Sequence, residues 1–158
     1  MPQIDNLQTV PLDSFSLAWR WIGPDCQELP EDALSTIRCL DEQSARNLSP
    51  LLKKANPAPG AISKDYVTAA RVSTSSRPAL VTTWLHDRMV ADDVVVAVSW
   101  DDVTAVVLPW RTFAAHWQAF CYPSSDDVTV IPADEAWLLV YAHYEEMLFA
   151  TRVRLGVV

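Results

Sequence analysis

Short apolar runs, the first two of them rich in β-branched residues, fill the second half of the chain and constrain its fold more than any other feature. In order they are "DVVVAVSW", "VTAVVLPW", "VTVIP", "AWLLVYAH" and "MLFATRVRL". Acidic pairs or polar loops separate them, and runs of this length and composition favour strands, the first two forming a hairpin. Between the second and third runs, Phe113, Trp117 and Phe120 follow helical spacing, which predicts a helix over residues 111–120.

The first half carries a more mixed pattern. Apolar side chains alternate along "SFSLAWRWIG", which predicts a strand from Phe15 to Trp21 with one buried face and directs Arg20 outward. Acids at the starts and lysines near an end of apolar periodic segments are typical of helices. Three helices are predicted, over residues 29–40, 41–55 and 77–89. Pro50 suggests a bend or break in the second, and Pro78 lies near the first turn of the third.

These elements predict an α+β fold. Half of the residues are hydrophobic and seven are tryptophan, so a chain of 158 residues can build one sizeable core. We expect a single domain over residues 1–158, with an antiparallel sheet of five or six strands and helices packed mainly on one face. The loop at residues 56–63 is the candidate seam between subdomains, and residues 61–76 give no clear secondary structure.

Acidic residues occur mostly as adjacent pairs. Fourteen of the twenty acids are paired in this way, which suits turns and helix starts better than strands. Following the predicted strands up and down the sheet brings three of these pairs to the same end. They are Asp101-Asp102, Asp126-Asp127 and Glu145-Glu146. The sequence therefore predicts an acidic edge, either as a functional surface or as solvated turns.

The overall charge and several missing motifs exclude whole classes of function. A net charge of −8 disfavours binding to nucleic acids and to anionic membranes, and it permits a basic protein partner. The chain shows neither a secretory signal nor an apolar run of transmembrane length. Three cysteines without paired spacing indicate reduced thiols, so we expect a cytoplasmic protein. Three scattered glycines exclude the usual phosphate-binding loops, and we expect no cofactor.

Two clusters contain residue types that carry chemistry elsewhere. In "VYAHYEEMLFATR", His143 and Glu145 lie together, and with Asp127 they could form an acid–base or metal site. No metal-binding spacing accompanies them, so solvated acids on a hairpin tip are the plainer interpretation. Cys121 with His116 could form a thiol site, although a buried free cysteine is more common. The sequence therefore names no catalytic residue.

The region from residue 110 to residue 152 resembles small acidic bacterial immunity proteins of polymorphic toxin systems. The resemblance rests on "WRTFAAHWQAF", "SSDDVTVIP" and a closing pattern of Trp137, Tyr141, His143, Glu145 and Phe149. Pro11-Leu12-Asp13 and Ala18-Trp19 also resemble the start of short uncharacterised bacterial proteins. The resemblance implies a non-enzymatic cytoplasmic protein that binds a toxin-like partner.

The functional prediction that follows is a binding protein that uses its acidic edge to hold a basic protein. The expected contact residues are Asp101, Asp102, Asp126, Asp127, His143, Glu145 and Glu146, with Trp100, Tyr122 and Tyr144 as aromatic anchors. Two alternatives remain open. One is a small enzyme or metal-binding protein with its site around His143, Glu145 and Asp127, and the other is a structural or homo-oligomeric subunit.

Overall fold

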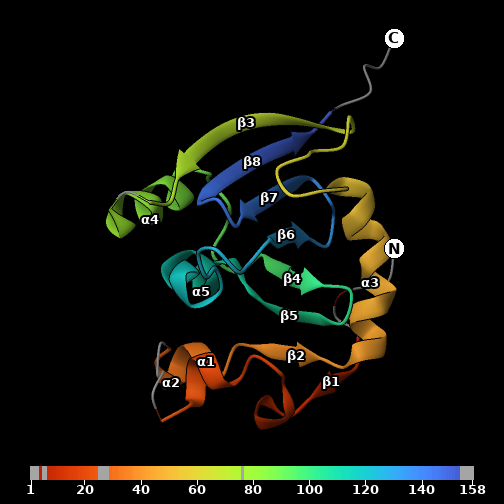
Figure 1. Cartoon of the computed structure of the whole chain (residues 1–158), viewed down its shortest axis with the longest axis vertical. Helices are drawn as coiled ribbons and strands as arrows, with labels where there is room; N and C mark the ends of the chain where they lie inside the picture. The colour runs from red at the N-terminus through yellow and green to blue at the C-terminus, as the bar shows by residue number, and fades with distance from the viewer. Residues whose placement is uncertain (1–3, 5–6, 25–28, 76, 154–158) are drawn as a thin grey trace.

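A single antiparallel sheet of eight strands forms the centre of the molecule (Figure 1). The computed structural model describes residues 4, 7–24, 29–75 and 77–153. The strand order is β1-β2-β5-β4-β6-β7-β8-β3. The bounds are β1 (Thr9–Val10), β2 (Arg38–Leu40), β3 (Tyr66–Ser73), β4 (Val95–Asp101), β5 (Thr104–Pro109), β6 (Val128–Pro132), β7 (Trp137–Ala142) and β8 (Glu146–Arg152). Strands from both sides of the 56–63 loop belong to this one sheet, since β2 pairs with β5 and β3 pairs with β8.

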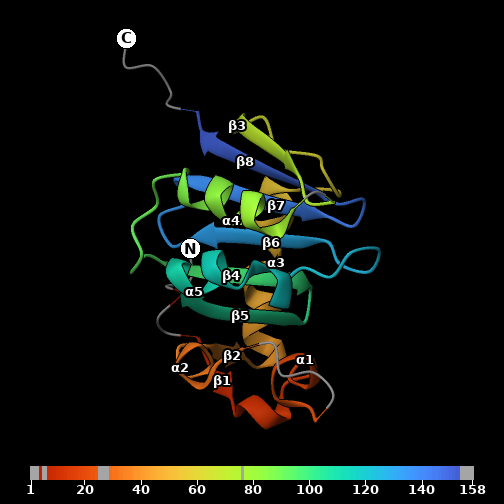
Figure 2. The ribbon, with the colours of Figure 1, turned by 90° about the vertical axis from the view of Figure 1, so that its left-hand side faces the viewer.

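Helices cover both faces of the sheet. Within the described residues they are α1 (Trp19–Ile22), α2 (Glu31–Leu34), α3 (Glu42–Ala55), α4 (Pro78–His86) and α5 (Trp110–Ala115), with short 3-10 helices η2 (Leu12–Ser14) and η3 (Trp117–Ala119). The long helix α3 lies against one face, and the shorter helices lie against the other (Figure 1). Figure 2 looks onto that second face, where α4 and α5 cross in front of the central strands.

The prediction of five or six strands with helices mainly on one face is wrong, because the sheet has eight strands and both faces are covered. β1 and β2 are two and three residues long, too short to establish a period. β3 is an edge strand whose side chains are mostly exposed or half-buried, so it lacks the apolar alternation of a half-buried strand. All three strands form because a neighbouring strand, distant in the sequence for β2 and β3, offers backbone hydrogen bonds.

The predicted strand from Phe15 to Trp21 is also wrong, because this segment turns and ends in α1. Phe15 and Trp21 are both buried and stack with ring centroids 5.8 Å apart, as inward-facing residues of a strand would. The residues between them do not alternate. Trp19 is 52% exposed and Arg20 is only 5% exposed, which reverses the predicted orientation of both side chains.

The helix predictions have mixed outcomes. The helix over residues 41–55 is confirmed as α3, where the Asp41 carboxylate accepts a hydrogen bond from the Ser44 amide at 2.7 Å and Pro50 does not end the helix. The helix over residues 77–89 is confirmed as α4. The other two were too long. Residues 29–40 form α2 and then β2, and residues 111–120 divide between α5 and η3.

Two hydrophobic cores explain why the central strands read as continuous apolar runs. In β4, Val96 and Val98 enter an aromatic-rich core beneath α1, α4 and α5. Ala97, between them, enters a second, aliphatic core beneath α3. Successive side chains of a strand point to opposite faces, so a strand covered on both sides needs apolar residues at every position.

Candidate functional site

The strand register brings the three predicted acidic pairs to one end of the sheet. β4 ends at Asp101, and Ser99 of β4 pairs with Thr129 of β6, just after Asp126-Asp127. β7 and β8 are joined at the same end, where Ala142 pairs with Glu146. The predicted arrangement of the acids is therefore confirmed. We call the group formed by Asp101, Asp102, Asp127, His143, Tyr144, Glu145 and Glu146 the strand-end surface.

Asp126 does not belong to this surface, because it is buried with Arg20. The two side chains form a bidentate ion pair with distances of 2.7 and 3.1 Å, and Asp126 is only 7% exposed. The Tyr122 amide also donates to Asp126 at 2.8 Å, while the Tyr122 ring lies 3.9 Å from the Arg20 guanidinium carbon. Asp126 thus holds α1 against the sheet. The prediction that Asp126 contacts a partner is wrong, because its carboxylate is buried.

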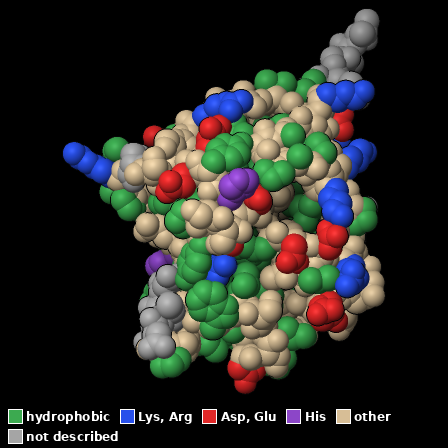
Figure 3. Space-filling model, in the orientation of Figure 1, with side chains coloured by type: hydrophobic (Ala, Val, Ile, Leu, Met, Phe, Trp, Pro, Cys, Tyr) green, Lys and Arg blue, Asp and Glu red, His purple; other side chains and the backbone are tan. Residues whose placement is uncertain are grey.

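Two more acids of the predicted edge have basic partners at the surface. Asp102 accepts from Lys53 at 2.9 Å and from Ser49 at 2.7 Å, and the hydrogen bonds from Ser49 and then Lys53 lower the pKa of its carboxyl below the ordinary 3.8. Glu146 pairs with Arg71 at 2.8 Å. Figure 3 shows one face of the molecule, on which acidic and basic side chains are intermixed. Lysine and arginine therefore neutralise part of the acidic edge.

Asp127 and His143 form an exposed pair at the tip of the β7–β8 hairpin. Asp127 Oδ1 accepts from the His143 amide at 2.9 Å and lies 3.0 Å from His143 Nδ1. This distance meets one requirement of the acid–base alternative. Both side chains remain substantially exposed, however, at 50% for His143 and 39% for Asp127. Their clear effect is to fix the turn, since one carboxylate oxygen contacts both the backbone and the ring of His143.

Asp101 and Glu145 are the two acids of the strand-end surface that form no ion pair within the described residues. Asp101 is exposed, and its side chain accepts from the Val103 amide at 2.9 Å, which closes the β4–β5 turn. Glu145 has a positive φ of 65° at the end of a three-residue hairpin loop, the position where such loops use a left-handed residue. Among the described residues, neither side chain is neutralised by a direct ion pair.

The aromatic residues at this end divide into buried and exposed ones. Trp100 is half-buried, its indole nitrogen donates to the Phe120 carbonyl at 2.8 Å, and its ring lies 6.2 Å from that of Trp21. Trp100 thus belongs to the core and does not fit the anchor role expected of it. Tyr144 is 54% exposed and fits that role. Trp19 is 52% exposed and fits the role equally well. Sequence reasoning missed it, because the alternating pattern predicted a strand with the Trp19 side chain on its buried face.

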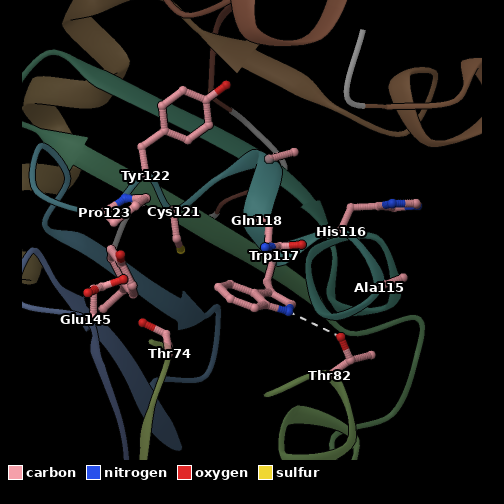
Figure 4. Close-up of a pocket in the computed structure, with 12 residues that line it drawn as sticks. Thr74, Thr82, Ala115, His116, Trp117, Gln118, Cys121, Tyr122, Pro123 and Glu145 are labelled. Atoms are coloured by element: carbon pink, nitrogen blue, oxygen red, sulfur yellow. Dashed lines mark hydrogen bonds between the residues drawn. The ribbon is translucent and has the colours of Figure 1, made fainter. Parts of the chain in front are cut away.

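A hollow of about 630 Å³ opens beside the strand-end surface. Its walls come from three places, namely the segment from α5 to Pro123, Thr82 of α4, and the sheet end with Thr74, Tyr141 and Glu145 (Figure 4). Cys121 lines it as well, but burial raises the pKa of this thiol well above the ordinary 9.0. His116 points away from Cys121 (Figure 4), so the two do not form a nucleophile and base.

Metal binding finds no support among the described residues, which contain no group of three or more histidine, cysteine, aspartate or glutamate side chains able to hold an ion. No described helix is both long enough and apolar enough to cross a membrane.

Comparisons of the chain with protein-family models, with curated proteins and with solved structures each found no match. The resemblance to immunity proteins therefore stays a prediction.

Proposed function

We propose that this protein is a non-enzymatic, cytoplasmic binding protein that holds a basic protein partner at the strand-end surface, in the manner of an immunity protein. The observation that carries the proposal is that two carboxylates without an ion pair in the described residues, Asp101 and Glu145, lie with exposed aromatic rings at the same end of the sheet. Complementary charge contributes specificity and fast association, and an exposed aromatic anchor contributes affinity.

The charge would act first on encounter. The net charge of −8 attracts a basic protein over distances comparable to the Debye length, which is about 8 Å at physiological ionic strength. At close range the ion-paired acids Asp102 and Glu146 contribute less, because Lys53 and Arg71 already neutralise them. Asp101 and Glu145 remain to select the orientation of the partner.

The aromatic anchors would supply affinity after encounter. Tyr144 projects from the hairpin tip with its ring centroid 5.4 Å from that of His143, and more than half of its surface is exposed. Trp19 is exposed to a similar degree and packs edge-on against Tyr122 with centroids 6.0 Å apart. Large rigid rings lose little conformational entropy on binding, and Trp and Tyr dominate measured binding hot spots.

The test begins with affinity capture of partners from a lysate of the source organism at low and high salt, followed by association kinetics with the basic protein recovered. We expect Asp101→Lys to slow association by about tenfold at low salt, with a smaller effect at high salt. Asp134→Lys is the matched control. Asp134 also closes a hairpin turn, by accepting from the Ala136 amide at 3.1 Å, but it lies at the opposite end of the sheet.

Equal association rates for the two variants would contradict the proposal, and so would the absence of any basic protein at low salt. Circular dichroism of both variants is needed alongside, because each substitution removes one turn-closing hydrogen bond. A partner that Asp101→Lys weakens and Asp134→Lys does not would support the strand-end surface as the contact.

A further inference from the structure

We propose that the hollow beside the hairpin tip binds an alkylguanidinium or alkylammonium group, supplied by an arginine or lysine side chain of the basic partner. The source of the cation rests on the function proposed above, while cation binding itself rests on the hollow alone. A carboxylate at its rim, buried hydrogen-bonding groups within it and apolar residues in its wall suit such a cation (Figure 4).

Glu145 determines the charge that this hollow prefers. Among the described residues that line the hollow it is the only acidic one, and none of them is a lysine or an arginine. Its backbone is held on both sides, since the Glu145 amide donates to the Ala142 carbonyl at 2.9 Å and the Thr74 amide donates to the Glu145 carbonyl at 2.8 Å. The carboxylate is therefore attached to a fixed turn, which reduces the entropy lost on binding a cation.

Thr74 gives a second, independent reason to expect a hydrogen-bond donor from a ligand in the hollow. The residue is only 9% exposed, and its buried Oγ1 atom accepts no hydrogen bond in the described chain. Burial raises the pKa of the neighbouring Tyr141 phenol to about 12, and a hydrogen bond from the Thr74 hydroxyl partly offsets that rise, so the hydroxyl can act as a donor toward Tyr141 while its acceptor side stays open. Buried polar groups are normally satisfied, so Thr74 marks a place for an N–H group from outside the chain.

The groups deeper in the hollow add hydrogen-bonding capacity without adding charge. Tyr141 and Cys121 both have raised pKa values because of burial, so both stay neutral at neutral pH. In Figure 4, Thr74, Glu145 and Cys121 lie on one side of the hollow, whereas Tyr122 and His116 point away from it. The Glu145 carboxylate can therefore balance one positive charge in the hollow.

The opposite wall suits an aliphatic stem. Trp117 is buried, and its indole nitrogen donates to Thr82 Oγ1 at 3.2 Å, so the ring is held in place between α4 and η3 (Figure 4). Ala115 and Ala119 add apolar surface, and Pro123 adds more on the side of Glu145 (Figure 4). Lysine and arginine combine an apolar stem with a charged head, which matches a hollow with one apolar wall and one carboxylate.

Other ligand classes fit less well. An anion would meet the Glu145 carboxylate with no basic side chain to balance it, apart from His116, which points away. A metal ion would need more ligands than this hollow offers, because the described residues hold no group suited to one. Guanidinium and ammonium groups need one carboxylate and several neutral acceptors, and these are present.

The experiment titrates the isolated protein with N-acetylarginine methylamide and N-acetyllysine methylamide while backbone amides are followed by NMR. The uncharged isostere N-acetylcitrulline methylamide is the ligand control. We expect the charged probes to shift the amides of Thr74, Gln118 and Glu145. Glu145→Gln should weaken binding by about tenfold, because it removes a charge-assisted hydrogen bond. Asp134→Asn, which changes a turn carboxylate at the opposite end of the sheet and outside this hollow, should leave the affinity unchanged.

Three results would overturn cation binding. They are the absence of shifts up to the solubility limit of the charged probes, equal shifts with the citrulline probe, and equal weakening by Glu145→Gln and Asp134→Asn. Thr74→Val provides a second variant that keeps the shape of the side chain and removes only its hydroxyl, and it should weaken binding by a few-fold.

Association kinetics with the captured partner separate this inference from the proposed function. If Asp101→Lys slows association and the arginine probe does not bind, the hollow inference fails and the binding function stands. If the probe binds and Glu145→Gln leaves partner association unchanged, cation binding stands and the partner's side chain is excluded as its source. Parallel loss of probe affinity and partner affinity in Glu145→Gln would support both.

Discussion

Asp126 and Asp127 are neighbours in the chain and belong to two different layers at the same end of the sheet. Asp126 lies in a closed layer beneath α1, where Arg20 neutralises it and both side chains are more than nine-tenths buried. Asp127 lies in an open layer at the β7–β8 hairpin tip, where His143 and Asp127 both face solvent in part. Residue type is the same in both layers, so burial decides whether a carboxylate holds the fold together or remains available for contact.

Breaking the closed layer should have the largest effect. Asp126→Asn leaves the Arg20 charge buried without its counter-charge, and we expect a loss of about 3–5 kcal/mol in the free energy of unfolding. Urea denaturation followed by tryptophan fluorescence measures it. Glu146→Gln is the control, because it breaks the exposed pair with Arg71 and should cost about 0–1 kcal/mol. The distinction between the layers would be lost if the two variants had the same stability.

Removing both charges of the closed layer sharpens the same test. The double variant Arg20→Met with Asp126→Leu should recover most of the stability that Asp126→Asn loses, because apolar residues of similar size often replace buried ion pairs at little cost. A double variant as unstable as the single one would show instead that the hydrogen bond from the Tyr122 amide to Asp126 contributes most.

The open layer should show an intermediate effect through Gly60. This residue has a φ of +72°, and a Cβ atom there would collide with the Tyr144 hydroxyl. We expect Gly60→Ala to cost about 1 kcal/mol or more, partly from backbone strain and partly from the displaced tyrosine. In a Tyr144→Phe background the collision is relieved and only the strain remains, so a double-mutant cycle separates the two terms. If the destabilisation by Gly60→Ala were the same with Tyr144 and with Tyr144→Phe in the background, residues 60 and 144 would not interact. The hairpin tip would then not contact the 56–63 loop.

The smallest effect should come from Asp102, whose side chain is exposed. Ser49 and Lys53 hold the pKa of its carboxyl below the ordinary 3.8, so the stability that it contributes is present above this value and is lost as the pH falls through the folded-state pKa. Asp102→Asn should therefore lower Tm only slightly at neutral pH, and the difference should vanish in strong acid. Calorimetry from pH 7 to pH 2 checks the sign. A gap that widened in acid would be incompatible with this pairing.

The prediction of the second half of the sheet succeeded because its signal is local. β4, β5 and β6 each carry a run rich in β-branched residues, β7 and β8 carry apolar runs, and all five runs are long enough to define a direction. Direction alone then places Asp101, Asp127 and Glu145 at one end. The short strands β1 and β2 and the edge strand β3 have no such signal, because they depend on pairing with strands far away in the chain.

The prediction of the candidate site was only half successful, because neighbours in space decide exposure. Period-two spacing around Trp19 could not show that Arg20 is held by a carboxylate 106 positions later. Nor could the residue types around Trp100 show that its indole nitrogen would be satisfied by Phe120 inside the core. Tyr144 was found because it lies in a turn between two clear strands, where exposure follows from local structure.

By itself, the sequence determined the acidic character of the molecule, the central strands and the end of the sheet at which the acids gather. These properties depend on composition and on contacts between residues close in the chain. Only the tertiary structure decided which acids are neutralised, which aromatic rings are exposed and where the hollow beside Glu145 opens. Charge pairing and burial depend on residues far apart in the chain, and their positions are known only once the eight strands are assembled.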